Sequence, residues 1–238
     1  MSRSMWTTWL VPGFLCRSTL SERSGGLLTE GGSRGRISLP TVAISAHGRR
    51  ITDRVVVPIG QLLVRVHVTA NALTTIGLLG TIAGLAVILA GYPFAGAATA
   101  AAAAVLDALD GTVARLTGTQ SQLGSFYDSV SDRVSDVAIF STAAWIVRDD
   151  PVAFTVVSIA LGSALVTSYI RAKAESLGWD ASVGIVERPE RVILMLSALG
   201  LGFVELAAWL LAAGGLVTIA QRLLAVVRQS RAASEPRP

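Results

Sequence analysis

The chain has 238 residues, of which 52% are hydrophobic and 15% charged, with a formal net charge of +4 at pH 7. A soluble domain carries about a quarter of its residues charged, and the apolar residues here form blocks near the length needed to cross ~30 Å of hydrocarbon. These values exclude an ordinary soluble protein, and the single cysteine, Cys16, excludes an internal disulfide.

The N-terminal part of the chain differs from the rest. Residues 1–48 are rich in Ser, Gly and Arg without sustained periodicity, so we expect a disordered extension. Basic and apolar patches alternate over residues 49–68, which predicts a helix lying in the membrane interface. Residues 229–238 form a polar tail, which leaves residues 49–228 as one membrane domain.

Six apolar segments follow the interfacial helix, and each predicts a transmembrane helix. The expected fold class is therefore all-α and integral to the membrane, with six transmembrane helices plus the N-terminal interfacial helix. The segments cover residues 71–90, 94–109, 123–147, 152–169, 192–204 and 206–226.

The basic residues of the loops predict the orientation. Arginines and the only lysine gather in the N-terminal arm, in the loops after the second and fourth segments and in the tail, whereas Arg148 stands alone on the opposite side. By the positive-inside rule, both termini face the cytoplasm of the plasma membrane. Arginines between apolar blocks also suit anionic lipid headgroups and phosphate substrates, so we expect no nucleic-acid partner.

Four aspartates at the junction of the second and third segments form the clearest chemical signal. Asp107 and Asp110 are three residues apart, and Asp128 and Asp132 are four apart, so each pair lies on one face of a helix. Each charge there costs roughly 2.5–3.5 kcal/mol on insertion scales, so the cluster needs cations. Oxygen ligands without nearby Cys or His favour Mg²⁺, or Mn²⁺, and four carboxylates suffice for two ions. The plainer alternative is a solvated acidic loop with capping aspartates.

Small and basic residues accompany these aspartates. Gly111 allows a ligand close to the backbone, Arg115 can pair with a phosphate oxygen, and Asp136 either supports a metal ligand or pairs structurally with Arg133. The order D-x2-D-G-x2-A-R-x8-G-x3-D-x3-D holds at positions 107, 110, 111, 114, 115, 124, 128 and 132. In these eight residues the chain resembles the CDP-alcohol phosphotransferase family.

The resemblance implies a function for each motif position. Family members transfer a phosphatidyl or similar group from a CDP-linked donor to an alcohol and release CMP. Asp107, Asp110 and Asp128 would bind metal, and Asp132 would face the metals and act as general base. Gly111 and Arg115 of the motif would contact the donor, CDP-diacylglycerol, and Ser121 in the following loop would add a further contact. Family members also carry a P-N-x-x-T element, which here has Ala70 in place of the proline. Its Asn71 and Thr74 would contact the donor as well.

A second stretch, Ser168–Arg191, concerns the acceptor alcohol. Its basic residues, among them the only lysine, Lys173, could reflect the positive-inside rule alone. They would also suit an acceptor that carries a phosphate. The run S-Y-I-R-A-K-A-E followed by E-R-P-E-R resembles actinobacterial phosphatidylinositol phosphate synthases, which use inositol 3-phosphate, over residues 49–228. The resemblance implies a homodimer and an acceptor-phosphate site made by Ser168, Arg171, Lys173, Arg191 and Arg222.

Other functions stay open at this stage. A phosphatidylglycerophosphate synthase, which uses glycerol 3-phosphate, would need the same basic pocket. A membrane cation transporter would also hold intramembrane carboxylates, although these would be expected near the midplane of several broken helices. A catalytically silent membrane scaffold would have no use for four intact carboxylates.

Overall fold

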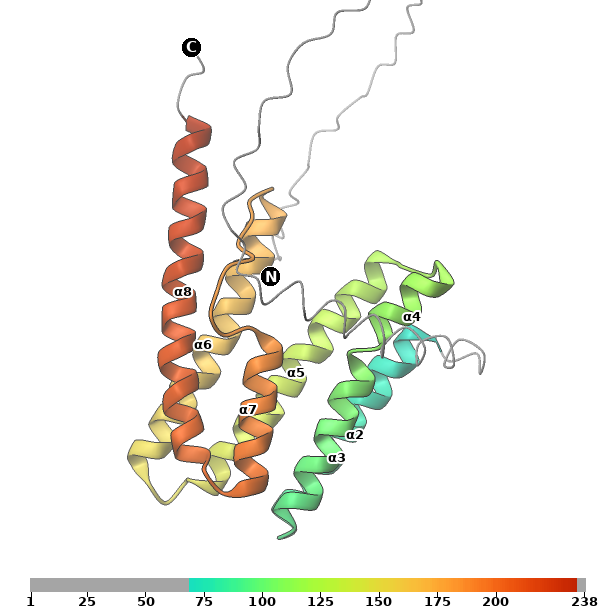
Figure 1. Ribbon diagram of the computed structural model, residues 1–238, viewed down its shortest axis with the longest axis vertical. Coiled ribbons are helices and arrows are strands. Elements are labelled where there is room, and N and C mark those ends of the chain that lie inside the picture. The colour runs from blue at the N-terminus through green and yellow to red at the C-terminus, as the bar shows by residue number, and fades with distance from the viewer. Residues whose placement is uncertain (1–68, 235–238) are drawn as a thin grey trace, which may run out of the picture. The chain divides into compact units, whose positions relative to one another are not determined.

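The computed structural model describes residues 69–234, so the expected extension over residues 1–48 and the interfacial helix over residues 49–68 lie outside the described residues. Within residues 69–234 every regular element is a helix, which confirms the predicted all-α class (Figure 1). In chain order the helices are α2 (Ala70–Leu89), α3 (Pro93–Asp107), α4 (Asp110–Thr117), α5 (Gln122–Ile146), α6 (Pro151–Ser176), α7 (Arg188–Leu201) and α8 (Val204–Ser234).

Each of the six predicted segments contains a helix, but not every one of these helices is long and apolar enough to span a membrane. In the described part, four stretches are long and apolar enough to cross a bilayer: Ala70–Leu89, Pro93–Thr117, Pro151–Ser176 and Val204–Ala233. Helix α5 carries several charged residues, and α7 has only 14 residues. The structure therefore supports four spans, and six spans remain a prediction.

Local capping explains where three of the helices begin. The hydroxyl of Thr69 accepts a hydrogen bond from the backbone of Ala72 at the start of α2, and the hydroxyl of Ser121 does the same for Gly124 at the start of α5. Asp150 caps α6, and Pro151 follows in its first turn. These side chains satisfy backbone N–H groups that a helix start leaves unpaired.

Helices α2 and α3 pack closely because glycines line their contact. A Cβ atom placed on Gly84 would lie 2.6 Å from the carbonyl oxygen of Gly96, and one on Gly80 would lie 2.8 Å from the Cβ of Ala103. We call this contact the glycine seam; it contains Gly77, Gly80, Gly84 and Gly96. At its polar end, a Cβ on Gly77 would lie 2.6 Å from the Cβ of Asp107. Small residues let two membrane helices approach backbone to backbone, and here they set Asp107 directly against α2.

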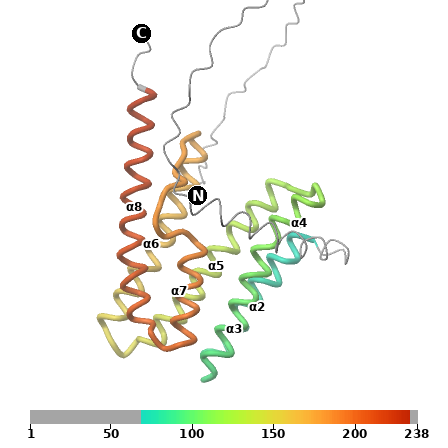
Figure 2. The backbone as a smooth tube through the Cα atoms, in the orientation of Figure 1, coloured from blue at the N-terminus to red at the C-terminus, as the bar shows by residue number. Residues whose placement is uncertain are grey.

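The other helices enclose an apolar core. Helix α5 contacts α2, α6 and α7, while α6 packs along α8 (Figure 2). Ile139 and Phe140 of α5 are almost fully buried against Val157 of α6 and Met195 of α7, within the same apolar cluster as Leu211 of α8. Helix α5 therefore joins the α2–α3 pair to the α6–α8 group.

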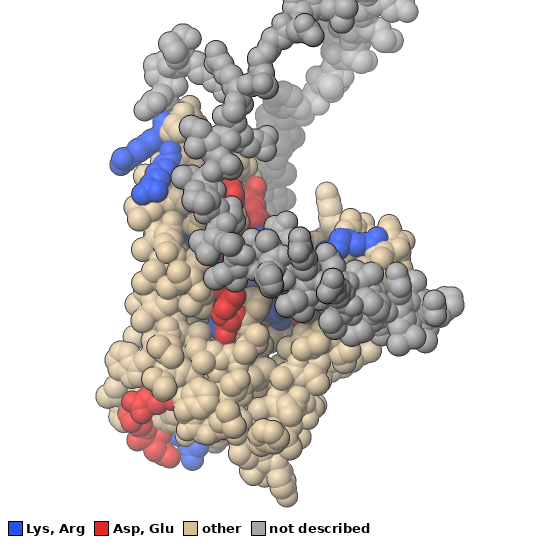
Figure 3. Space-filling model, in the orientation of Figure 1, with Lys and Arg blue, Asp and Glu red and all other residues tan. Residues whose placement is uncertain are grey.

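The outer surface suits a lipid environment. Large apolar side chains such as Leu79, Phe94, Trp209 and Leu216 are exposed. On the face drawn in Figure 3, charged residues of the described part form a few small groups in an otherwise uncharged surface. A broad exposed apolar surface is unusual for a soluble monomer and ordinary for a protein in a bilayer.

The loop between α6 and α7 is fixed along α8. The backbone N–H of Val186 donates to the hydroxyl of Thr218 at 3.2 Å, and Arg222 donates to the carbonyl oxygen of Val183 at 2.8 Å. Further along, Gln229 accepts from the backbone N–H of Asp180 at 2.9 Å. Hydrogen bonds from Ser182 also lower the pKa of Asp180. Three levels of α8 thus hold this loop and set the position at which α7 begins.

Candidate active site

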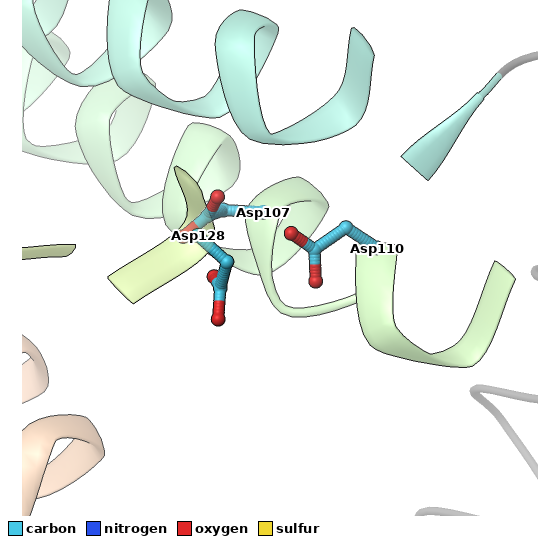
Figure 4. Close-up of side chains that lie close together, drawn as sticks. All are labelled: Asp107, Asp110 and Asp128. Carbon is cyan, nitrogen blue, oxygen red and sulfur yellow. The ribbon is translucent and has the colours of Figure 1, made fainter. Parts of the chain in front are cut away.

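Three of the four predicted metal ligands lie together. Asp107 ends α3, Asp110 begins α4, and Asp128 lies in the second turn of α5. One carboxylate oxygen from each lies within 4.8 Å of the others. Figure 4 shows the three side chains close together. The glycine seam positions Asp107. Residues 110–122, which lie between the second and third apolar segments predicted from the sequence, contain the short helix α4, and this helix presents Asp110.

Asp132 lies next to this triad and is joined to it by Arg188. The Nη2 atom of Arg188 lies 3.2 Å from Oδ2 of Asp107 and 2.9 Å from Oδ1 of Asp132. Arg133 adds a longer contact, 3.5 Å to Oδ2 of Asp132. The predicted base is therefore held in an ion pair that it shares with a predicted metal ligand. The sequence had marked Arg188 only as one of several basic loop residues.

The donor set fits Mg²⁺ or Mn²⁺. All candidate ligand atoms in the triad are carboxylate oxygens, which these hard cations prefer. Oδ1 of Asp107 is buried and accepts no hydrogen bond within the described residues. A buried carboxylate oxygen without a donor is costly unless a cation is near it. The residues thus fit the cofactor expected from the sequence.

A polar pocket of about 350 Å³ opens on one side of the triad. Thr74 of α2 donates to Oδ2 of Asp110 at 2.5 Å, which orients that carboxylate. The five residues predicted to contact the donor nucleotide all line this pocket, together with Asp110 and Asp128: Asn71, Thr74, Gly111, Arg115 and Ser121. Ser121 also caps α5, so one residue shapes the pocket and starts the helix that carries Asp128 and Asp132.

An apolar groove of about 600 Å³ lies between α3 and α7. It extends from Phe94 and Leu201 at one end to Arg115 and Arg188 near the carboxylates, and its walls are mainly alanine, leucine and valine. Arg115 lines both the groove and the polar pocket. The two cavities therefore lie next to each other, with Arg115 in the lining of both and the acidic triad close by, which suits a ligand with a polar head, a phosphate-bearing middle and an apolar tail.

The residues predicted for the acceptor phosphate fall into two groups. Ser168, Arg191 and Arg222 are buried: Arg191 donates to Ser168 at 3.1 Å, and Arg222 donates to the carbonyl oxygen of Thr167 at 2.6 Å. Arg171, one turn after Ser168, is exposed and pairs with Glu175 at 2.9 Å. These contacts gather four of the five residues around one turn of α6.

Lys173 is the exception among these five. It is exposed on α6 two residues after Arg171, and two residues turn a helix by about 200°. Its side chain therefore leaves the helix on the face opposite Arg171. A single phosphate held by Arg171 would not reach Lys173 on the same helix.

A second ion pair lies one turn deeper than Asp132 and Arg188. Two guanidinium nitrogens of Arg191 donate to Oδ2 of Asp136, at 3.1 and 2.7 Å, and both side chains are at most 5% exposed. Arg133, considered as a partner of Asp136 from the sequence, instead reaches the carbonyl oxygen of Ser129 and Asp132. Sequence spacing gave no means to choose between an arginine on the same helix and one on a distant helix.

Comparison with known proteins identifies a family that this chain matches over most of its described residues. A family model described as CDP-alcohol phosphatidyltransferase matches residues 67–221. A phosphatidylinositol phosphate synthase from Corynebacterium glutamicum is 35% identical over 193 residues, which cover 76% of this chain and 88% of that protein.

Solved structures of a Mycobacterium tuberculosis phosphatidylinositol phosphate synthase are also similar. The form with CDP-DAG bound has a TM-score of 0.66 and 34% identity, and the match covers 73% of this chain and 94% of the other. The form in complex with manganese and citrate has a TM-score of 0.66 and 33% identity, covering 73% and 89%.

Proposed function

The chain belongs to the CDP-alcohol phosphatidyltransferase family, and from this premise we propose that it transfers the phosphatidyl group of CDP-diacylglycerol to inositol 3-phosphate and releases CMP. The observation that carries the proposal is that Arg115 lines both the polar pocket and the apolar groove, near the cluster of Asp107, Asp110 and Asp128. A cation transporter would have no use for such an amphipathic cavity.

The two cavities match the two halves of the donor. The cytidine would occupy the polar pocket, where Asn71 and Thr74 line one wall and Gly111 leaves room next to Arg115. The acyl chains would lie in the groove between α3 and α7, whose apolar lining replaces lipid contacts. The diphosphate would then lie next to Arg115, which lines both cavities and would pair with its oxygens.

Metal ligation would come from Asp107, Asp110 and Asp128, with Asp132 facing the same space. Two Mg²⁺ or Mn²⁺ ions held there would neutralise the diphosphate and polarise its P–O bonds. Thr74 supports this arrangement, because its hydrogen bond fixes the direction of the Asp110 carboxylate. A similar protein crystallised in complex with manganese supports a divalent cation in this family.

Asp132 would act as the general base. Its carboxylate accepts the proton of the attacking inositol hydroxyl, and the oxygen forms a new bond to the phosphorus nearer the lipid. The bond from that phosphorus to the oxygen of CMP breaks, and the electron pair leaves with CMP. Asp132 lies one turn along α5 from Asp128, so one helix would present both a metal ligand and the base.

The acceptor phosphate would bind near α6. Ser168, Arg171, Arg191 and Arg222 gather around one of its turns and form the core of this proposed site. Lys173, on the opposite face of α6, would act on a different part of the acceptor or steer it electrostatically. Relatives named phosphatidylinositol phosphate synthase favour an inositol phosphate over glycerol 3-phosphate.

The proposal includes the wider setting of the enzyme. We place the active site at the cytoplasmic edge of the plasma membrane, with six spans and both termini inside, because the basic loops flank the acidic site. Residues 49–228 would form the catalytic membrane domain, between an N-terminal extension and a short tail. A homodimer is proposed from the family resemblance.

Release of CMP by purified protein tests the proposal. The protein in detergent would receive CDP-diacylglycerol and Mg²⁺ or Mn²⁺, with inositol 3-phosphate, glycerol 3-phosphate or unphosphorylated inositol as acceptor. Of these three acceptors, we expect only inositol 3-phosphate to give rapid CMP release. If CMP release is faster with glycerol 3-phosphate, the proposed acceptor is wrong but the proposed type of reaction stands. If no acceptor leads to CMP release, the proposed reaction is overturned.

A further inference from the structure

Arg188 differs from the other arginines near the site in what holds it. A single nitrogen of Arg188, Nη2, bridges Asp107 and Asp132. Within residues 69–234 the Nε atom of Arg188 makes no hydrogen bond. Its side chain is 27% exposed, whereas that of Arg191, three residues later on α7, is 5% exposed and donates to both Asp136 and Ser168. Arg188 is therefore held by two carboxylates that also belong to the proposed metal site.

The same carboxylates cannot serve a guanidinium and a divalent cation equally well, even where the two cations would approach different oxygens of one carboxylate. Arg188 occupies Oδ2 of Asp107 and approaches Oδ1 of Asp132. A divalent cation and a guanidinium that approach the same carboxylates lie a few ångströms apart, and at a partly buried site such like charges repel each other strongly. Metal loading thus favours movement of the guanidinium away from the carboxylates.

The groove offers a place to which Arg188 can move. Arg188 is the first residue of α7, directly after the irregular α6–α7 loop, and it lines the polar end of the apolar groove together with Arg115. A donor phosphate between these two arginines would meet two cationic forks, the geometry that guanidinium groups use to bind phosphate.

We propose that Arg188 is an exchangeable counter-ion of the active site: it bridges Asp107 and Asp132 when divalent ions are scarce and moves to the lipid-linked phosphate of the donor when ions occupy the carboxylates. The inference rests on the proposed metal site and deepens it. Arg188 competes with metal for the carboxylates and joins metal loading to donor binding.

Replacing Arg188 should destabilise the protein without metal and leave its stability almost unchanged with metal. In a chelator, Arg188→Gln leaves two partly buried carboxylates without their counter-ion, so its apparent melting temperature falls by roughly 4–8 °C relative to the unaltered protein. In saturating Mn²⁺ the difference closes to about 1 °C or less. Direct Mn²⁺ titration followed by electron paramagnetic resonance shows binding that is tighter by roughly 3- to 10-fold, because the competing charge is gone.

Three controls make the result specific. Arg191→Gln removes the deeper arginine, so its melting temperature falls equally with and without Mn²⁺. Arg148→Gln, at an exposed arginine beside Asp149 and Trp145, changes neither measurement. Arg188→Lys keeps the charge and retains most of the stability in chelator, which keeps the test decisive if Arg188→Gln does not fold.

The outcomes separate this inference from the proposed function. If the unaltered protein binds no Mn²⁺, the metal site itself fails. If it binds Mn²⁺ but Arg188→Gln binds it equally or more weakly, Arg188 is not a competitor and the inference is overturned. A melting temperature lowered to the same extent in chelator and in Mn²⁺ overturns it as well, because that result marks a purely structural arginine.

Discussion

Two ion pairs link the same two helices and behave differently. Asp132 and Asp136 lie one turn apart on α5, and their partners Arg188 and Arg191 lie one turn apart on α7. In the deeper pair, Arg191 gives two nitrogens to one oxygen of Asp136, and both side chains are buried. In the outer pair, Arg188 is shared between Asp132 and a carboxylate of the acidic triad.

The difference shows how one pairing chemistry supports two roles. A buried, bidentate pair is a structural brace, since removing either partner leaves a charge without compensation. A shared and partly exposed pair leaves its carboxylates short of positive charge and open to other cations. The number of carboxylates that each arginine neutralises and the exposure of its side chain, more than the residue types, separate the deeper pair from the outer one.

Asp132→Asn breaks the outer pair at the proposed base. We expect a loss of CMP release of roughly 1,000-fold or more, because general-base catalysis contributes 10²–10⁴. Gel filtration of the variant should show an unchanged peak. Asp149→Asn, at the exposed Asp149 beside Arg148, should keep the full rate. Turnover near that of the unaltered protein would assign the base to another group.

Arg191→Met breaks the deeper pair. The stranded Asp136 carboxylate should lower the free energy of unfolding by roughly 3–5 kcal/mol, as for other buried pairs that lose one partner. The double variant with Asp136→Leu should recover most of that loss, since both charges are then absent. Denaturant-induced unfolding in detergent measures both values. A double variant no more stable than Arg191→Met would contradict the role of the pair as a brace.

Asp107→Asn tests the acidic triad next to the outer pair. Loss of one anionic ligand should weaken Mn²⁺ binding by roughly 100-fold, at the upper end of the range known for weakened metal sites. Titration of CMP release against Mn²⁺ would show this as a shift in the half-saturating concentration. An unchanged midpoint would remove Asp107 from the set of metal ligands.

Gly77→Ala makes the smallest change, a single methyl group. The added Cβ would lie 2.6 Å from the Cβ of Asp107, so α2 and α3 must separate and the carboxylate must shift. We expect Mn²⁺ affinity to fall by roughly 10-fold, since displacements of about 1 Å in catalytic groups are costly. Gly162→Ala on α6 is the matched control, because a Cβ there meets nothing within 4 Å.

Much of the fold was readable because apolar blocks and helical spacing are local properties. The six segments each contain a helix in the structure, and the spacing of Asp107, Asp110 and Asp128 predicted a cluster that the structure brings within 4.8 Å. The short helix α4 was missed, since its eight residues are mostly polar or small and begin with Asp110-Gly111, a pattern typical of a loop. The span count also exceeded what helix length and composition support for α5 and α7.

The pairing of distant side chains could not be read in this way. Arg188 and Asp107 are 81 residues apart, and sequence spacing carries no information on which arginine of α7 meets which aspartate. The run E-R-P-E-R contains both Arg188 and Arg191, but it did not indicate which of them would be buried. To tell the exposed arginine, Arg188, from the buried one, Arg191, the burial of each side chain among the packed helices had to be known.

The glycine seam between α2 and α3 also bears on the order in which the protein assembles. These helices are neighbours in sequence, joined by a turn of three residues, Ala90–Tyr92, and contacts between neighbours form quickly. We expect the hairpin to close soon after insertion, which places Asp107, Asp110 and Thr74 together before α5 is synthesised. The acidic site would then be incomplete until α5 is inserted and supplies Asp128 and Asp132. The arginines of α7 and α8 would be added last, and they would compensate the negative charge of the assembled site.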